Sequence, residues 1–448
     1  MFIEKFSRLG FILAAAGSAV GLGNIWKFPY MAGENGGGAF VLVYLITVLV
    51  IGFAIMLAEM LIGYLGKGDT VTSFENLAPE KSKKLWRFAG FQALTALLIM
   101  SFYSVVIGWI INYIVISFYS LPATFEEAKT TFSTMVGTDI PTQLFYHTIA
   151  FLLITYVVNR GIKGGIEKVN LVLMPALMLI FLGMLGYAFT LDGFGQAVNF
   201  LFSADWSKIN SHIVIIAIGH AFFTLSLGMG AIMTYSASLP ENSNILKSAI
   251  WVALLDTAIA LVAGVVLFTF VFHNGAEPSQ GPGLVFISLP VAFHSIGDAG
   301  IFLAVLFFTA LAFAGFTSAV SLVEPMVQFA IDKFNWSRLK ASAIMGLSFY
   351  LIGIVALLSN TEQFAEVLTF GSRNFFDTLD HVTTAIMLPL AGFVMAIFVG
   401  YVVDKSKIEA VLKKPLGFAF ELWYFSLRYI VPVALFVVAL SLMGVITI

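Results

Sequence analysis

The sequence predicts an all-α membrane protein with eleven transmembrane helices, and three observations support this fold class. Of the 448 residues, 60% are hydrophobic and only 11% are charged, whereas a soluble domain is about 25% charged. The hydrophobic residues form eleven long runs, most of them near the roughly 20 residues that a helix needs to cross a bilayer. Glycine clusters interrupt the first and sixth runs, which predicts helices that are unwound at mid-membrane.

The eleven runs predict the order of the spans and the division of the chain. They cover residues 8–32, 38–65, 86–119, 144–159, 168–191, 212–240, 246–273, 300–332, 340–358, 377–403 and 417–447. The interrupted spans one and six are five spans apart, an offset that gives two five-helix halves opposite orientations in the membrane. We therefore predict two inverted five-helix repeats, 1–191 and 192–403, and then an interior loop and eleventh helix in 404–448. The proline-rich segment 274–299 is expected to form a structured lid.

The distribution of basic residues predicts the orientation in the bilayer. With a cytoplasmic N-terminus, the interior segments carry eighteen Lys and Arg residues, and the exterior segments carry only Lys129, Lys208 and Arg373. Basic residues concentrate on the cytoplasmic side, so eleven spans place the C-terminus outside. A formal net charge of −2 with dispersed basic residues gives no sign of nucleic-acid binding. Cysteine is absent, which excludes disulfides and thiolate metal sites.

The two glycine clusters predict a binding site at mid-membrane. They read AGSAVGLGN at 16–24 and FFTLSLGMG at 222–230. Glycine inside a helix costs about 1 kcal/mol relative to alanine, and unpaired backbone at membrane depth is tolerated only where protein encloses a cavity. Two interrupted helices in corresponding halves are typical of transporters that bind an ion and a solute.

Neutral oxygen atoms cluster at these interruptions and in span eight, and they are ligands that suit an alkali cation. Hydroxyl groups in membrane helices also commonly bond to their own helix carbonyls. For one hydroxyl group alone, a hydrogen bond to its own helix is the favoured interpretation. A group of several oxygen atoms beside two glycine interruptions instead favours binding of a cation. The set comprises the carbonyls of Gly17 and Val20, the Asn24 amide, and the hydroxyls of Thr224, Thr317 and Ser318.

Three carboxylates lie deep in predicted spans. Asp256 lies about ten residues into span seven, roughly 15 Å along the helix, where a carboxylate costs several kcal/mol unless it is paired. A bound cation is the expected partner; a protonated carboxyl is the alternative. Glu59 and Glu324 are expected to accept hydrogen bonds from backbone amides freed at the interruptions, in preference to coupling protons. His220 remains open as either a core histidine or a pH-sensitive cavity residue.

Two further interpretations stay open from spacing alone. Lys27 follows the first interruption, and Asp377 and Asp380 begin span ten on the same predicted side. They would either form an ion pair that closes above the cavity or extend separately to the membrane surface. Tyr103 in span three would either donate a hydrogen bond into the cavity or simply pack.

Several motifs together resemble one known family along nearly the whole chain. They are RLGF at 8–11, GSAVGLGNIWKFPY at 17–30, ENGGGAF at 34–40, AFFTLSLG at 221–228 and AGFTS at 314–318. These segments are similar to the neurotransmitter:sodium symporter family, whose prokaryotic members include eleven-span amino-acid transporters. The resemblance implies two sodium ions. One would be held by the Ala19 carbonyl, Asn24, Thr224, Asp256 and the substrate carboxylate, and the other by the Gly17, Val20 and Ala314 carbonyls with Thr317 and Ser318.

The resemblance also implies how the substrate binds. Tyr103 would contact the substrate carboxylate, and Phe223 would form an outer aromatic lid. Gly21 stands where amine-specific relatives carry aspartate, which favours an amino acid over a monoamine. The pocket carries no charge, and Met229 can adapt to several shapes, so the expected substrates are neutral and hydrophobic. The implied substrate-binding residues are Ala19, Gly21, Gly23, Ile99, Tyr103, Phe223, Thr224, Ser226, Met229, Ser318 and Leu322.

The chain departs from relatives at the gates and at the first sodium site. Lys27 stands where relatives often have arginine. The outer gate with Asp380 would therefore use a lysine ammonium group, which cannot make the two parallel hydrogen bonds that an arginine makes to a carboxylate. Asp332 matches an inner-gate aspartate, but Phe2 stands where its arginine partner is expected, so the inner gate would either use Lys5 or be weak. Asp256 stands where the bacterial leucine transporter has asparagine. The aspartate supplies a negative charge at the first sodium site, which predicts that chloride is not needed. Gly165 and Pro175 match a motif linked to inward opening.

These observations predict sodium-coupled, chloride-independent symport of neutral hydrophobic L-amino acids across a prokaryotic plasma membrane. The first alternative is a proton-coupled carrier of the same architecture, based on Glu59, Glu324 and His220. The second is an amino-acid sensor that does not transport. No nucleophile–base pair is visible, so an enzyme is not expected. The sequence does not indicate an oligomeric state.

Overall fold

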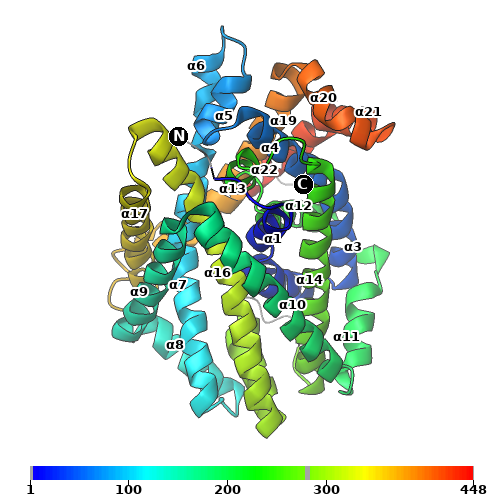
Figure 1. Ribbon diagram of the computed structural model, residues 1–448. Coiled ribbons are helices and arrows are strands. Elements are labelled where there is room, and N and C mark those ends of the chain that lie inside the picture. Colours follow the sequence, from blue (N-terminus) through cyan, green and yellow to red (C-terminus); the bar gives the residue numbers. More distant parts are fainter. Residues whose placement is uncertain (1–3, 278–282, 447–448) are drawn as a thin grey trace.

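The computed structural model describes residues 4–277 and 283–446, and its helices follow the predicted spans (Figure 1). The first five spans are α1 (Arg8–Ala19) with η1 (Gly23–Lys27) and α2 (Phe28–Glu34); α3 (Gly38–Thr47), η2 (Val48–Gly52) and α4 (Phe53–Gly66); α6 (Lys83–Trp86), η3 (Arg87–Gln92) and α7 (Ala93–Tyr119); α9 (Ile140–Asn159); and η4 (Ile162–Glu167) with α10 (Lys168–Ala188). Between them lie α5 (Thr70–Leu77) and α8 (Phe125–Gly137).

The second half has the same alternation of long helices and short connections. Its spans are α12 (Ser211–Thr224) with α13 (Ala231–Ala237); α14 (Ile245–His273); α16 (Asp298–Phe334); α17 (Arg338–Leu358); α18 (Phe375–His381), η7 (Val382–Met387), α19 (Leu388–Ile397) and η8 (Phe398–Val402); and α21 (Ala419–Phe425), η9 (Ser426–Ile430) and α22 (Val431–Leu442). The connections hold α11 (Gly193–Phe202), η5 (Trp206–Lys208), η6 (Leu284–Ser288), α15 (Leu289–Ser295), β1 (Thr369–Phe370), β2 (Arg373–Asn374) and α20 (Lys405–Leu416).

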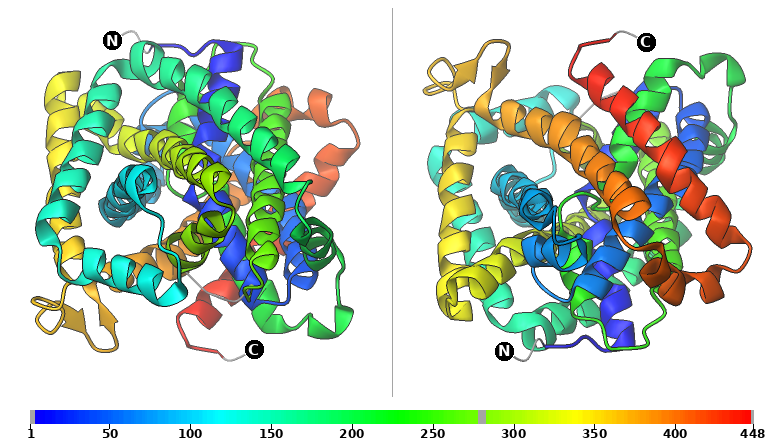
Figure 2. Two further views of the ribbon diagram at one scale, coloured as in Figure 1. Left: turned by 90° about the horizontal axis from the view of Figure 1, so that it is seen from below. Right: turned by 90° about the horizontal axis from the view of Figure 1, so that it is seen from above.

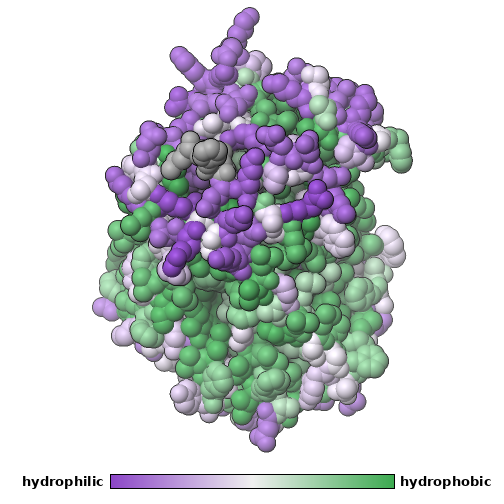
Figure 3. Space-filling view, viewed as in Figure 1, coloured by the Kyte–Doolittle hydropathy of each residue, from purple (hydrophilic) through white to green (hydrophobic). Residues whose placement is uncertain are grey.

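The helix lengths confirm an all-helical membrane protein. Within the described ranges, nine helices are long and apolar enough to cross a membrane, and the bent pair 8–19 and 23–34 adds a tenth. The predicted sixth span is α12 and α13, each too short to cross alone because residues 225–230 are not helical. The predicted lid segment contains η6 and α15, whereas its residues 278–282 lie outside the described part. Exposed hydrophobic side chains cover much of the surface in Figure 3, and hydrophilic ones gather near α5, α6 and α20.

The first interrupted span lies near the centre of the molecule (Figure 2). Its α1 packs against α10, α14 and α16, while α13 packs against α4. The helix ends at Ala19 because Val20 adopts an extended conformation, with ψ of 101°. In the sixth span, Ser226, Gly228 and Gly230 have φ values of 53°, 76° and 77°, which belong to the left-handed region that favours glycine. Both interruptions thus bring backbone groups that lie outside regular helix to the interior.

Candidate functional site

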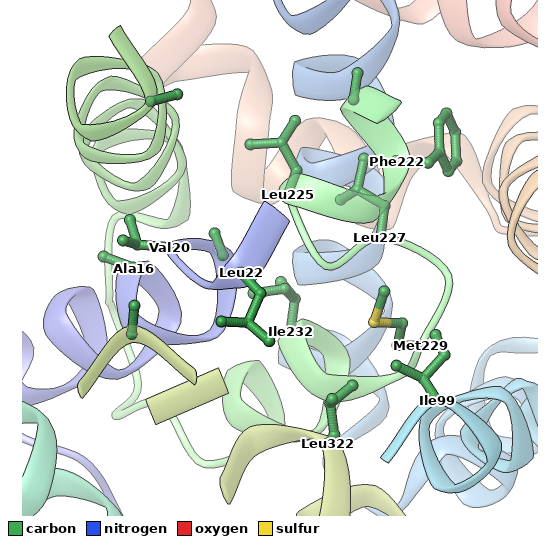
Figure 4. Packing of buried hydrophobic residues seen from close by; sticks show 14 of the residues in the cluster. Ala16, Val20, Leu22, Ile99, Phe222, Leu225, Leu227, Met229, Ile232 and Leu322 are labelled. Carbon is green, nitrogen blue, oxygen red and sulfur yellow. The ribbon is translucent and has the colours of Figure 1, made fainter. Parts of the chain in front are cut away.

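The two interruptions enclose a cavity together with α7 and α16. Figure 4 shows Met229 from the second interruption beside Ile99, with Leu322 pointing toward the same space. All the predicted substrate-binding residues except Thr224 line this cavity, and Ser18 is an addition. The lining comprises Ser18, Ala19, Gly21, Gly23, Ile99, Tyr103, Phe223, Ser226, Met229, Ser318 and Leu322. Sequence positions about 300 residues apart therefore meet around one small space.

The cavity has polar groups at one end and apolar side chains at the other. The Leu22 amide donates to the Tyr103 hydroxyl at 3.1 Å, and the Ser226 hydroxyl donates to the Ser18 carbonyl at 2.6 Å. A Cβ atom added to Gly21 would lie 2.8 Å from the Tyr103 hydroxyl and even closer to Ser318 Oγ. Glycine at this position therefore leaves the room that backbone and hydroxyl groups need to face a ligand.

Asp256 forms the centre of a buried polar cluster beside this cavity. The Asn24 amide donates to Asp256 Oδ1 at 2.7 Å and to the Asp256 carbonyl at 3.0 Å. The Thr224 hydroxyl donates to the same Oδ1 at 3.1 Å, and the Gly21 amide donates to Asn24 Oδ1 at 3.0 Å. The predicted first-site side chains thus come together around one carboxylate. A carboxylate and neutral oxygens are hard ligands of the kind that fit sodium.

Sequence reasoning missed Tyr44, which completes this cluster from α3. Its hydroxyl donates to Asp256 Oδ2 at 3.4 Å, and its ring lies 5.4 Å from the His220 ring. His220 is buried and also faces the rings of Phe28 and Phe40, 6.0 and 6.1 Å away. Nothing in the spacing of span two distinguished Tyr44, because its contact with Asp256 joins residues 212 positions apart.

The predicted second-site residues meet between α1 and α16. The Ser318 hydroxyl donates to the carbonyls of Gly17 and Val20 at 3.0 and 3.3 Å. The Thr317 hydroxyl instead donates within its own helix, to Phe313 and to Ala314, at 3.0 and 3.1 Å. Ser318 therefore reaches the first interruption, while Thr317 makes the helix-internal bonds that membrane hydroxyls commonly make. These oxygens also suit a hard cation.

Lys27 and Asp380 meet on the predicted exterior side. Their charged atoms lie 3.8 Å apart, and Lys27 Nζ lies 4.7 Å from the centre of the Phe223 ring. The ion pair thus forms instead of two separate extensions to the surface. Phe223 lies between the central cavity and a second cavity of about 370 Å³, since it lines both. That outer cavity is aromatic and includes Trp26, Asp377 and Asp380.

On the opposite side, Asp332 accepts hydrogen bonds from the N-cap residue of α5 and from its own helix, and no basic side chain of the described part of the chain pairs with it. Its Oδ2 accepts the Asp69 amide at 3.0 Å, and its Oδ1 accepts from Gln328 at 2.8 Å. Asp69 is the N-cap of α5, and burial raises its pKa above the usual aspartate value. Phe2, the position of the expected gate partner, lies outside the described residues.

The other deep carboxylates have different roles. Glu59 is fully buried and accepts the Gly228 amide at 3.0 Å, as expected of an acceptor for backbone freed by the second interruption. For Glu324 the same expectation was wrong, because its Oε2 accepts from Arg338 of α17 at 2.5 Å. Arg338 is the first residue of α17 and also donates to the Val158 carbonyl. A basic residue at the start of the next span thus neutralises Glu324.

A multi-span helical protein with two interrupted helices around a central cavity is a membrane transporter. A family model described as the sodium:neurotransmitter symporter family matches residues 4–140 and 129–447. The chain belongs to this family, as its motifs predicted. It is therefore a sodium-dependent transporter and not an enzyme.

Similar proteins agree with this assignment. An uncharacterized sodium-dependent transporter of Bacillus subtilis is 34% identical, covering 99% of this chain and 98% of its own. Another from Haemophilus influenzae is 33% identical, with 97% of each chain covered. The crystal structure of MhsT in complex with L-phenylalanine matches with a TM-score of 0.90 and 41% identity, covering 99% of this chain and 100% of MhsT.

Proposed function

We propose that this transporter couples sodium to the uptake of neutral, hydrophobic L-amino acids in a prokaryotic plasma membrane and needs no chloride. The observation that carries the proposal is the central cavity: backbone and hydroxyl groups meet apolar side chains, and none of the described residues that line it is charged. A charged substrate side chain would lose its hydration there without gaining a partner. The structure of MhsT with L-phenylalanine supports the same substrate class.

The polar end of the cavity suits the amino-acid backbone. The substrate carboxylate would face the Tyr103 hydroxyl, the amides of residues 21–23 and a sodium ion, because amides at a helix break attract anions. The amino group would face carbonyls near Ser226. The side chain would extend toward Ile99, Met229 and Leu322.

Two sodium ions are proposed to bind beside the substrate. The first would be held by the Ala19 carbonyl, Asn24, Thr224 and Asp256. The second would be held by Thr317 and Ser318 with the carbonyls of Gly17, Val20 and Ala314. The fully buried Asp256 would then balance one positive charge, which is the physical reason for independence from chloride.

A proton-coupled mechanism has weaker support. Glu59 accepts the Gly228 amide and Glu324 pairs with Arg338, so both have structural roles. A sensor that binds without transport also has weaker support, because Lys27 with Asp380 and Asp332 with Asp69 provide closing contacts at both ends of the site. We further propose that the N-terminus is cytoplasmic and the C-terminus exterior.

Substrate binding should strengthen with sodium. Because linkage is reciprocal, a substrate that contacts a bound sodium ion must raise sodium affinity and gain affinity from it. Binding of labelled leucine or phenylalanine to the purified protein is therefore expected to rise as sodium replaces potassium at constant ionic strength. Binding that is equal in the two salts would refute the coupling. Uptake into proteoliposomes that needs an inward sodium gradient separates transport from sensing.

Met229→Phe should narrow the range of substrates. The added ring would occupy the apolar end of the cavity, where Met229 is buried beside Ile99 and Leu322. We expect affinity for phenylalanine and tryptophan to fall by about tenfold or more while leucine loses less, since overpacking costs about 1–3 kcal/mol. Competition assays measure the ratio. Met233→Phe is a control, because Met233 is buried outside the cavity. An unchanged ratio in Met229→Phe, or strong preference for glutamate or lysine, would contradict the pocket assignment.

A further inference from the structure

Asn170 of α10 carries a buried oxygen atom with no hydrogen-bond partner among the described residues. The side chain has no exposed surface. Its Nδ2 atom donates to the Ile166 carbonyl at 2.9 Å, while Oδ1 lacks a donor. Because a carbonyl can only accept, this bond fixes the nitrogen end of the carboxamide at Ile166. The oxygen must therefore point away from its own helix.

The oxygen points at the second predicted sodium site. A Cβ atom added to Gly17 would collide with Asn170 Oδ1 and would lie 3.1 Å from Thr317 Cβ. Asn170 thus faces α1 at Gly17, next to Thr317. The carbonyl of Gly17 accepts the Ser318 hydroxyl. Asn170 therefore lies beside two of the predicted ligands of this site, Gly17 and Thr317, and was not itself predicted as a ligand.

An unpartnered amide oxygen costs about 1–3 kcal/mol when it is buried. An apolar residue at this position would fill the space between α1 and α10 without that cost. The oxygen therefore needs a partner at some stage of the transport cycle, and a neutral amide oxygen is a hard ligand suited to sodium.

The surroundings of Asn170 indicate the stage of the transport cycle at which its oxygen gains a partner. Asn170 lies in the first turn of α10, which follows η4, a π-helical turn of the kind that often marks functional sites. Ile162 of η4 lines a cavity of about 490 Å³ together with Glu4, Asp332 and Arg338. This cavity lies on the predicted cytoplasmic side. An opening at η4 would connect it to Asn170 and then to Thr317.

We propose that Asn170 Oδ1 binds the second sodium ion as it leaves its site toward the cytoplasm. The inference rests on the proposed sodium coupling and adds a transit ligand to it. The oxygen replaces part of the coordination that Thr317 and Ser318 give up, so the ion crosses the gap beside Gly17 without losing all protein ligands. In the closed site Asn170 is a neighbour of the ion and not a ligand.

Asn170→Leu and Asn170→Asp test this role in proteoliposomes with set sodium concentrations on each side. We expect Asn170→Leu to leave the external sodium concentration for half-maximal uptake within twofold of wild type. The internal sodium concentration that halves uptake should rise at least fivefold, because the departing ion loses a ligand. Asn170→Asp should lower that internal concentration at least fivefold, because a carboxylate holds the cation more tightly. Equal shifts on both sides, or no shift on either, would overturn the proposal.

Met174→Leu is the matched packing control, since Met174 is buried one turn further along α10 and should alter neither concentration. If Asn170→Leu does not fold, Asn170→Ser and Asn170→Ala replace it. The serine side chain keeps an oxygen atom. The internal sodium concentration that halves uptake should therefore lie closer to wild type in Asn170→Ser than in Asn170→Ala. Identical concentrations in the two variants would overturn the proposal. Wild-type uptake that ignores sodium on both sides would instead refute the proposed coupling itself, so the two failures are distinguishable.

Discussion

Asp256→Asn is expected to raise the sodium concentration for half-maximal uptake by about tenfold or more, a loss of about 1.4 kcal/mol. Asp256 is fully buried, and its Oδ1 accepts from Asn24 and Thr224. Asparagine has the same shape, and its own oxygen can keep these two hydrogen bonds. The substitution therefore removes a negative charge and keeps these two bonds, while the Tyr44 hydroxyl, which donates to Oδ2, would have to accept from the new amide instead. A cation in a buried site depends strongly on such a charge, because the effective dielectric constant is low.

Two measurements isolate the charge. Wild-type uptake should proceed fully when gluconate replaces chloride, because Asp256 already supplies the negative charge. Glu75→Gln removes a carboxylate that pairs with Lys333 and Arg87 away from the cavity, and it should leave sodium dependence unchanged. Wild-type uptake that stops without chloride, or an Asp256→Asn variant with normal sodium affinity, would contradict this account.

The sequence predicted the fold well because length and hydropathy determine whether a helix can cross a membrane. All the long runs became helices, and both glycine clusters became interruptions. The sixth span differed most, since residues 225–230 include three positions with positive φ and split it into two short helices. A hydropathy profile averages over such a break and reports one span.

The cavity was predictable for a different reason. Glycine at position 21 and the motifs around it carry a family resemblance, and that resemblance predicted most of the residues that line the cavity. The contacts that were missed join elements without a shared pattern. Tyr44 reaches Asp256 from α3, Asn170 reaches Gly17 from α10, and Arg338 neutralises Glu324 from the start of α17. Helical periodicity describes which face a residue occupies, but it does not determine which other helix that face meets.

Gly21→Ala is expected to reduce substrate binding by about tenfold or more while the protein still folds. The added methyl group would collide with Ser318 Oγ and lie 2.8 Å from the Tyr103 hydroxyl. Both hydroxyls would have to shift, and overpacking of this kind costs about 1–3 kcal/mol. The shift would also disturb the Ser318 bond to the Gly17 carbonyl at 3.0 Å. Sodium affinity should therefore fall along with substrate affinity.

Gly183→Ala separates this effect from helix propensity. A Cβ atom at Gly183 meets nothing within 4 Å, so alanine there should leave binding unchanged and raise stability by about 1 kcal/mol at most. Adding Ser318→Ala to Gly21→Ala removes the closest overlap and should restore part of the melting temperature. It should not restore sodium-dependent binding, because the Ser318 hydroxyl is itself a proposed ligand. If Gly21→Ala binds substrate and sodium like wild type, the carboxylate does not lie against the first interruption, and the substrate must be placed elsewhere in the cavity.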